Sequence, residues 1–362
     1  MHDGGNLTQR ILFELTRGMY ASRTAKEPPP TGPERLLIVR VDERVGNLTT
    51  LQSLLDALKV AFPGIQLGLL CSVLISTIGR TLQGWDHLHL LDKRWFFRRP
   101  WAWHEAIQQV REQRYQVAID ASAWPVFSYT HAALTYFSGA PQRIGYRRSG
   151  NSGFHTVLVD PGPAAEYELK QRMRLLTPLG VKMEPPRLRT TLGHEQRVHW
   201  EQWLRAQGSS ARRIGIWAGS RKMERRWPVE FYVRLGQRLI SPDGKGTRMV
   251  ILWGPGEEHL RDELAAGLPG VAIVPPPTDL VQLAGLIQTL DLVVTNDTGP
   301  MHMSVAAGIP TVALFASGVP TRWGHPYPFV RNLFVPGEAP SDVEQAVFAC
   351  RELMHQFHVA AD

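Results

Sequence analysis

Short apolar runs alternate with amphipathic segments from residue 35 onwards. The run Leu36–Val41 is apolar apart from Arg40, which is typical of a strand buried on both faces. Leucines then recur at spacings of three and four over residues 48–62, which predicts one amphipathic helix ending at Pro63-Gly64. Further apolar runs bounded by turn residues predict strands at 65–71, 116–120 and 143–146. Strands alternating with helices indicate a parallel, doubly wound α/β sheet.

The second half repeats this alternation, with glycine and proline at the expected helix ends. The predicted strands are 214–218, 249–253, 271–274, 292–295 and 311–315. The predicted helices are 228–240, 257–266, 279–290 and 298–307, and a last helix over about 341–357 could pack on either domain. The pattern therefore predicts a second Rossmann-like unit.

Proline-rich junctions predict the domain limits. Residues 28–33 read Pro-Pro-Pro-Thr-Gly-Pro, which cannot continue a helix. We therefore expect an N-terminal extension over 1–34, which allows one short helix around Leu12–Met19. Gly180, Pro185 and Pro186 cluster at a second junction. The two domains are accordingly predicted at 35–183 and 184–362.

Composition narrows the class of protein. Of the 362 residues 43% are hydrophobic and 20% are charged, which excludes a disordered chain, a collagen and a coiled coil. Two cysteines, Cys71 and Cys350, exclude a disulfide scaffold and a cysteine-based zinc site and fit a reducing cytosol. No apolar run approaches the roughly 20 residues that span a bilayer, and the N-terminus lacks a signal-peptide pattern. We expect a cytoplasmic protein.

The net charge of +7 is unevenly distributed. Residues 1–180 hold 21 Lys and Arg against 15 Asp and Glu, whereas residues 181–362 hold 19 against 18. The excess in the first half suggests an anionic partner there, although solvated surface charge explains it equally well.

The turns after strands are the expected places for chemistry, because ligands of open α/β sheets bind at the carboxyl ends of strands. The sharpest turn runs from Asn296 to His302. Asp297 or Thr298 can cap the following helix, Gly299 permits close approach, and Pro300 suits the first turn. Free amides and the helix dipole favour an anion such as a diphosphate. The alternative is a well-capped helix with a surface histidine.

Two more turns carry suitable side chains. The small turn Ala218-Gly219-Ser220 is followed by four cations, Arg221, Lys222, Arg225 and Arg226, which suit phosphate binding. Glu257 and Glu258 follow another strand; a carboxylate there could bind a ribose diol, or simply favour the helix N-terminus. The sequence has no Walker A motif and no GxGxxG after a strand, so ATPases and common dehydrogenases lose support.

Taken in order, these blocks resemble glycosyltransferase family 9, the ADP-heptose:lipopolysaccharide heptosyltransferases. The resemblance rests on residues 36–63 (LLIVRVDERVGNLTTLQSLLDALKVAFP), on 115–148 ending in RIGYRR, on 214–235, and on 248–325. The segment NDTGPMHMSVAAGIPTVALFASGVPTRWG is the most specific. The match covers roughly residues 35–330.

The resemblance implies a GT-B fold, with two Rossmann-like domains facing across a cleft, and an inverting transfer that needs no metal or other cofactor. The C-terminal domain would bind a nucleotide-diphosphate heptose, with ADP-heptose as the first candidate. Residues implied for the donor are Ser220, Arg225, Glu258 (with Glu257 one register away), Asp297, Thr298, Gly299, Met301 and His302. Arg225 would also stabilise the leaving group.

The implied acceptor is the anionic inner core of lipopolysaccharide, at the inner face of the membrane. Candidates for its phosphates and carboxylates are Arg40, Arg44, Arg143, Arg147 and Arg148. Basic and aromatic residues alternate over 93–103, which suits contact with a membrane surface. The same pattern can stack single-stranded nucleic acid or be a loop with inward aromatics; given the family, the membrane is the preferred partner.

One departure from the family concerns activity. The family's first turn carries Gly-Asp, whose Asp is the proposed general base, whereas this chain has Gly46-Asn47. An amide cannot take a proton from an acceptor hydroxyl. Another acid, among Asp42, Glu43 and Asp120, could serve instead; Asn47 could also mark a feeble enzyme or an engineered substitution. The alternatives to a transferase are a silent nucleotide-sugar binder, a sugar-nucleotide epimerase and a nucleic-acid binder.

Overall fold

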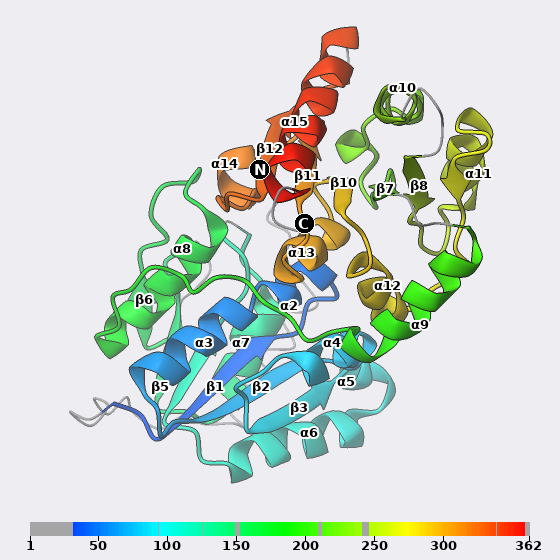
Figure 1. Cartoon of the computed structure of the whole chain (residues 1–362). Coiled ribbons are helices and arrows are strands. Elements are labelled where there is room, and N and C mark those ends of the chain that lie inside the picture. Colours follow the sequence, from blue (N-terminus) through cyan, green and yellow to red (C-terminus); the bar gives the residue numbers. More distant parts are fainter. Residues whose placement is uncertain are drawn as a thin grey trace. The chain divides into compact units, whose positions relative to one another are not determined.

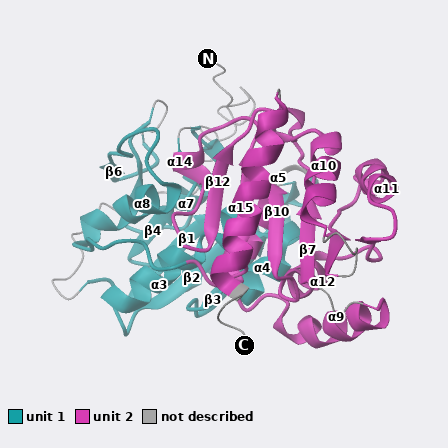
Figure 2. Cartoon of the chain, turned by 45° about the horizontal axis from the view of Figure 1, so that its top comes forward, with its two compact units in different colours: residues 1–187 teal, residues 188–362 magenta. Residues whose placement is uncertain are grey.

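The structure, a computed structural model, describes residues 32–92, 94–124, 126–148, 153–208, 212–240, 246–337 and 339–358. The chain forms two compact units, residues 1–187 and 188–362 (Figure 2). The sequence placed this division between 183 and 184. The N-terminal extension up to residue 31, with the helix considered around Leu12–Met19, lies outside the described residues.

Unit 1 is built on a six-stranded parallel sheet with the order β3-β2-β1-β4-β5-β6. Strands β1, β2 and β3 of this sheet lie side by side in Figure 1. The strands are β1 (Arg35–Arg40), β2 (Gln66–Ser72), β3 (His87–Leu91), β4 (Val117–Asp120), β5 (Gln142–Tyr146) and β6 (Val157–Val159). The helices are α2 (Val45–Thr49), α3 (Gln52–Ala61), α4 (Ser76–Thr81), α5 (Trp95–Arg98), α6 (Pro100–Glu112), α7 (Tyr129–Phe137) and α8 (Glu168–Met173). Strands β3 and β6 were not predicted, because one is interrupted by histidines and the other has only three residues.

Unit 2 has a second six-stranded parallel sheet with the order β12-β11-β10-β7-β8-β9. Its strands are β7 (Arg212–Trp217), β8 (Thr247–Ile251), β9 (Ala272–Ile273), β10 (Leu292–Asn296), β11 (Thr311–Phe315) and β12 (Val330–Phe334). Its helices are α9 (His194–Ala206), α10 (Val229–Leu239), α11 (Glu258–Gly267), α12 (Leu280–Ile287), α13 (Gly299–Ala306), α14 (Pro320–Trp323) and α15 (Pro340–His358).

Both sheets have the same topology. Numbered within its own unit, each runs 3-2-1-4-5-6, so the first and fourth strands are neighbours. After the first strand the chain continues towards one edge of the sheet, and after the fourth strand it continues towards the other edge. The carboxyl ends of β1 and β4, and of β7 and β10, are therefore the topological switch points at which such sheets bind ligands.

The helix predicted over 48–62 is two helices. Thr49 and Thr50 lie at the break, and their hydroxyls donate to the carbonyls of Val45 (3.0 Å) and Gly46 (2.8 Å). Threonine hydroxyls that bond to the preceding turn bend or interrupt helices. The short helix α2 thus becomes part of the turn after β1, which places Asn47 at the sheet edge.

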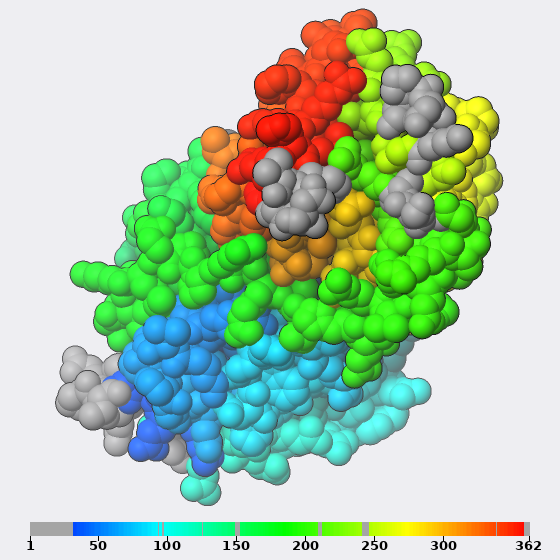
Figure 3. Space-filling view, in the orientation of Figure 1, coloured from blue at the N-terminus to red at the C-terminus, as the bar shows by residue number. Residues whose placement is uncertain are grey.

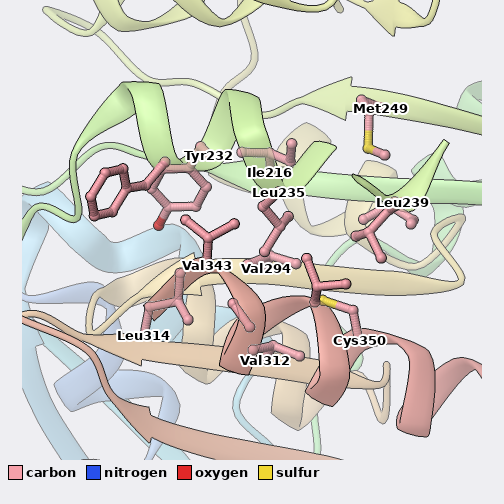
Figure 4. Packing of buried hydrophobic residues seen from close by; sticks show 14 of the residues in the cluster. Ile216, Tyr232, Leu235, Leu239, Met249, Val294, Val312, Leu314, Val343 and Cys350 are labelled. Carbon is pink, nitrogen blue, oxygen red and sulfur yellow. The ribbon is translucent and has the colours of Figure 1, made fainter. Parts of the chain in front are cut away.

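The last helix belongs to unit 2. Helix α15 packs on α10 and on strands β10 to β12. Val343 and Cys350, both labelled in Figure 4, enter the core of unit 2, and so does Leu353. Its other face is at the surface in Figure 3, where α15 is red, and carries Phe348, whose side chain is 70% exposed. Within the described residues, no helix is both long and apolar enough to cross a membrane.

The two faces of α15 give a matched test of this packing. Leu353→Ala removes a fully buried side chain and should lower the free energy of unfolding of unit 2 by about 2–5 kcal/mol. Phe348→Ala, on the exposed face, should change it by less than about 0.5 kcal/mol. Urea denaturation followed by tryptophan fluorescence compares the two variants. Equal shifts would contradict the position of α15 against this core.

Candidate functional site

The carboxyl ends of β7 and β10 are joined by one buried amide. Asn296 Oδ1 accepts from the Trp227 amide and from the Tyr232 hydroxyl, both at 3.0 Å. Its Nδ2 donates to the carbonyl of Ala218 at 2.7 Å. Asn296 is fully buried, so these bonds replace the water that it loses. They fix the small turn after β7 beside the turn after β10.

Arg225 and Asp297 meet at this edge. Arg225 Nη1 donates to Asp297 Oδ2 at 2.8 Å across 72 positions of sequence. Asp297 is 3% exposed, whereas 29% of the arginine side chain is exposed. Burial raises the pKa of Asp297, and the arginine charge offsets part of that shift. The pair places a cation, partly open to solvent, at the start of α13. Ser220, also buried, lies in the neighbouring turn, where its carbonyl accepts from Arg226 at 2.8 Å.

Helix α13 begins without a side-chain cap. Thr298 is the N-cap residue, and neither its hydroxyl nor the Asp297 carboxylate accepts from the first amides, which corrects the predicted capping. Gly299 and Pro300 open the helix. The amides that a cap would satisfy remain available, and with the helix dipole they favour an anionic ligand. Met301 is fully buried in a small core cluster with Phe315, so its side chain packs the helix onto β11.

His302 is oriented by a residue that the sequence did not indicate. His302 Nδ1 lies 2.8 Å from His325 Nε2, with the rings nearly perpendicular. Both histidines are buried, and His325 stacks on Tyr327 at 4° between the rings. A hydrogen bond at Nδ1 decides which tautomer His302 adopts, and so whether Nε2 donates or accepts. The partners are 23 positions apart, and no local pattern predicts such a pair.

Of the two adjacent acids after β8, Glu257 is the one at the sheet edge. Glu257 Oε2 accepts from the Gly254 amide at 3.1 Å. A Cβ at Gly219 would lie 1.9 Å from Glu257 Oε1, so only glycine fits beneath this carboxylate. Burial raises the pKa of Glu257. Glu258, which the resemblance implied, is exposed and accepts from the Gly256 amide. The carboxylate that faces the turn after β7 is therefore that of Glu257, one residue earlier.

At the switch point of unit 1, Asp42 and Asn47 are in contact. Asn47 Nδ2 donates to Asp42 Oδ1 at 2.9 Å. Asp42 Oδ2 pairs with Nε of Arg40, whose side chain is fully buried, while a quarter of the Asp42 side chain is exposed. Burial alone would raise the pKa of Asp42, but the Arg40 guanidinium, aided by the neighbouring His131 and Asn47, lowers it to about 2.

Asp120, at the end of β4, is enclosed. Its Oδ1 accepts from the Ser122 amide at 2.9 Å, and its Oδ2 lies 3.1 Å from His155 Nε2. Neither side chain of this pair has more than 1% exposure. Gly145 makes room for it, because a Cβ there would lie 2.5 Å from the His155 ring. Burial alone would raise the pKa of Asp120, but the hydrogen bond and charge of His155 lower it. A substrate hydroxyl has no access to these oxygens in this geometry.

The five arginines expected for the acceptor have different environments. Arg40 and Arg143 are buried, and Arg143 donates to the carbonyls of Phe154 (2.7 Å) and Ala140 (2.9 Å). Arg148 donates to the carbonyl of Val126 (2.6 Å) and to Ser122 Oγ (2.9 Å). Arg44 and Arg147 are exposed. Three of the five therefore support the backbone or neighbouring side chains, and the other two face solvent.

Over its described residues, 94–103, the basic and aromatic segment is mainly helical rather than a loop. It contributes α5 and the start of α6. Trp103 is buried and packs edge-on against Phe137, whereas Trp101 is 69% exposed. Arg98 and Arg99 are exposed beside it. No cluster of three or more metal-binding side chains occurs among the residues for which the structure gives positions.

Comparisons with known proteins give one consistent family. The sequence model of glycosyltransferase family 9 (heptosyltransferase) matches residues 103–344, so the turn with Asn47 precedes the matched region. The lipopolysaccharide heptosyltransferases 2 of Salmonella typhimurium and Escherichia coli K12 are 27% and 28% identical to the chain. Each alignment covers 58% of this chain and 62% of the relative's length.

Solved structures support the fold. The family 9 glycosyltransferase of Veillonella parvula aligns over 91% of this chain and all of its own, with a TM-score of 0.77 and 18% identity. The ADP-heptose heptosyltransferase II of E. coli aligns over 89% of this chain and 99% of its own, with a TM-score of 0.71 and 20% identity. These similarities confirm the predicted α/β fold class with two doubly wound units.

The buried Asp120–His155 pair predicts a stability that depends on pH. The folded-state pKa of Asp120 lies below the unfolded value of about 3.9. Its contribution is therefore complete above about pH 5 and is lost as the pH falls towards the folded-state pKa. Asp120→Asn should destabilise unit 1 by about 3–5 kcal/mol at pH 7, and by less near pH 3.

Urea denaturation at the two pH values measures this difference. Asp160→Asn is the control, because Asp160 is exposed and its Oδ1 accepts only a local bond, from the Gly162 amide at 2.7 Å, that asparagine can keep. A loss for Asp120→Asn that is the same at both pH values would show that the charge of Asp120 does not contribute.

Proposed function

The chain belongs to glycosyltransferase family 9 (heptosyltransferase), and from that premise we propose that it transfers a heptose or a related sugar from a nucleotide-diphosphate donor to a lipopolysaccharide-type acceptor. ADP-heptose is the first candidate donor, because relatives are named lipopolysaccharide heptosyltransferases and a structural neighbour, the E. coli heptosyltransferase WaaC, was solved with ADP.

One observation carries the donor assignment. The switch point of unit 2 combines a partly exposed cation, Arg225, with the uncapped start of α13 and with His302 one turn further on. These groups match the charge and the oxygen acceptors of a diphosphate. Glu257 lies at the neighbouring turn, where its carboxylate can accept from the hydroxyls of a ribose. The resulting site suits a nucleoside diphosphate with a sugar attached.

The proposed reaction is an in-line displacement with inversion. The acceptor hydroxyl oxygen forms a bond to the anomeric carbon of the donor. The bond from that carbon to the diphosphate oxygen breaks, and its electron pair remains on the diphosphate. Arg225 and the α13 amides stabilise the developing charge. In this proposal they serve in place of a metal ion, so activity should survive EDTA.

The acceptor proposal assigns the anionic inner core, or a similar anionic glycan, to unit 1. The exposed Arg44 and Arg147 are its first contacts, since Arg40 and Arg143 are buried and Arg148 is only partly exposed. A protein that uses such an acceptor would work in the cytoplasm at the inner face of the membrane. Trp101 with Arg98 and Arg99 forms a surface suited to anionic lipid.

A second candidate is a silent nucleotide-sugar binder. The observation that favours it is Asn47, an amide at the family's base position. The two candidates differ in one measurement, because both bind ADP-heptose but only the transferase releases ADP when a heptose-accepting inner-core glycolipid is added. Failure to bind ADP or ADP-heptose would overturn both.

Arg225 should contribute most to binding of the diphosphate. Arg225→Ala removes charge-assisted hydrogen bonds of about 1.5–3 kcal/mol and should weaken ADP affinity about 10–100-fold in isothermal titration calorimetry. Arg205→Ala is the matched control, because that arginine is exposed on α9 and pairs only locally with Glu201. Equal affinities for the two variants would exclude Arg225 from the site.

The membrane contact is tested by vesicle flotation. Trp101→Ser should reduce binding to phosphatidylglycerol-containing vesicles several-fold, because the exposed indole would lose its interfacial position. Val198→Ser on α9, which changes another exposed apolar side chain (63% exposed), should have no effect. Binding that is insensitive to Trp101 would remove this surface from the proposal.

A further inference from the structure

The proposed transfer needs a group that accepts the proton of the acceptor hydroxyl, and the inference below rests on that proposed function. Three titratable groups at the carboxyl edge of unit 1 are enclosed. Asp120 is fully buried and both of its oxygens are engaged. Glu168 is 5% exposed and lies beside Arg172. His131 is buried, and its Nε2 accepts from the Val41 amide at 3.0 Å.

Asp42 differs from these groups in being both accessible and incompletely bonded. A carboxylate offers about four lone-pair positions. Two donors bond to Asp42 Oδ1, namely the Asn47 side-chain amide (2.9 Å) and the Arg44 backbone amide (3.2 Å), and the Arg40 guanidinium lies against Oδ2 as an ion-pair partner. At least one position therefore remains, and a quarter of the side chain faces solvent. Asp42 can therefore accept one further hydrogen bond, as a general base must.

The turn around Asp42 is held rigidly. Arg172 on α8 donates to the carbonyl of Asn47 at 3.2 Å and to the hydroxyl of Thr50 at 2.7 Å. Arg40 donates to the carbonyl of Ala121, which ties the end of β1 to the end of β4. A base held by fixed neighbours keeps its position relative to the acceptor without reorganisation.

We propose that Asp42 is the general base of the transfer and that Asn47 is its positioning residue. The carboxylate that the family resemblance places at position 47 of this turn is supplied by Asp42 instead, and the Asn47 side-chain amide orients it. In the reaction the acceptor hydroxyl gives its proton to Asp42 while its oxygen bonds to the anomeric carbon. The diphosphate leaves with the electron pair, and Asp42 afterwards releases the proton to solvent.

Asp42 is in the ionised form that a proton acceptor needs at physiological pH. Burial raises and the Arg40 charge lowers the pKa of Asp42, with a result of about 2. The carboxylate is therefore fully ionised near neutrality. Such an acid is a weak base in the ground state, so proton transfer accompanies rather than precedes attack on the anomeric carbon.

An exchange of the two side chains tests the proposal. Transfer from ADP-heptose to an inner-core glycolipid and affinity for ADP are measured for the native chain, for Asp42→Asn, for Asn47→Asp and for the double exchange. Asp42→Asn should lose about 10²–10⁴-fold in kcat while its Kd for ADP stays within twofold, because the donor groups lie in unit 2. The double exchange, which returns a carboxylate to the turn, should recover at least tenfold over Asp42→Asn.

Chemical rescue separates a base from a structural carboxylate. Asp42→Ala should regain activity when formate is added, whereas a structural role would not respond to formate. Asp56→Asn is the matched control, because Asp56 lies on α3 and accepts from Gln52 at 2.7 Å. It should keep native activity, and circular dichroism should confirm that all variants are folded.

Two results would overturn the proposal while leaving the proposed transfer intact. Asp42→Asn could retain activity within tenfold of the native chain, or Asn47→Asp alone could gain 100-fold or more. A native chain that binds ADP-heptose without transferring the sugar would instead refute the proposed transferase and favour the silent binder. Absence of ADP binding in every variant, including the native chain, would refute both candidate functions.

Discussion

The placement of the first strand next to the fourth is the constraint on which the rest of each unit depends. Parallel strands need crossover connections, and these must lie on one face before the switch and on the other after it. The helices consequently separate above the carboxyl ends of β1 and β4, and of β7 and β10. Backbone groups and side chains at these points are not covered by a helix of the same layer. The candidate site residues of both units are concentrated there for this reason.

Buried polar side chains hold the ends of the two switch strands together in each unit. Asn296 in unit 2 and Arg40 in unit 1 are both fully buried, and each joins the ends of the two switch strands. Asn296 does so with neutral hydrogen bonds to Ala218, Trp227 and Tyr232. Arg40 uses a charge, which requires the Asp42 carboxylate as partner because an unpaired buried charge is unfavourable. The same ion pair that supports the turn therefore also brings a carboxylate to the surface.

Hydrophobic periodicity was enough to predict most of the fold. β1, β7, β10 and β11 are continuous apolar runs, and their predicted limits differ from the observed ones by at most two residues. Periodicity did not predict β3, whose histidines interrupt the apolar run, the three-residue β6, or β12, which contains Arg331 and Asn332. It also failed at Thr49 and Thr50, whose hydroxyl bonds to the backbone end a helix that the leucine spacing continues.

Within the site, turn chemistry predicted the positions of Arg225, Asp297 and His302, because each is local to a strand end. It could not distinguish Glu257 from Glu258, since one residue along a turn reverses the direction of a side chain, and it could not predict the contact of His302 with His325. Charge counting has a related limit. Arg40, Arg143 and Arg172 contribute to the excess positive charge of the first half, yet all three are buried and act on carbonyls, hydroxyls and carboxylates of their own unit. The surface potential of unit 1 is therefore set by fewer cations than the sequence contains. An anionic acceptor would be attracted by the exposed arginines, while the buried ones determine where the carboxylate that meets it is held.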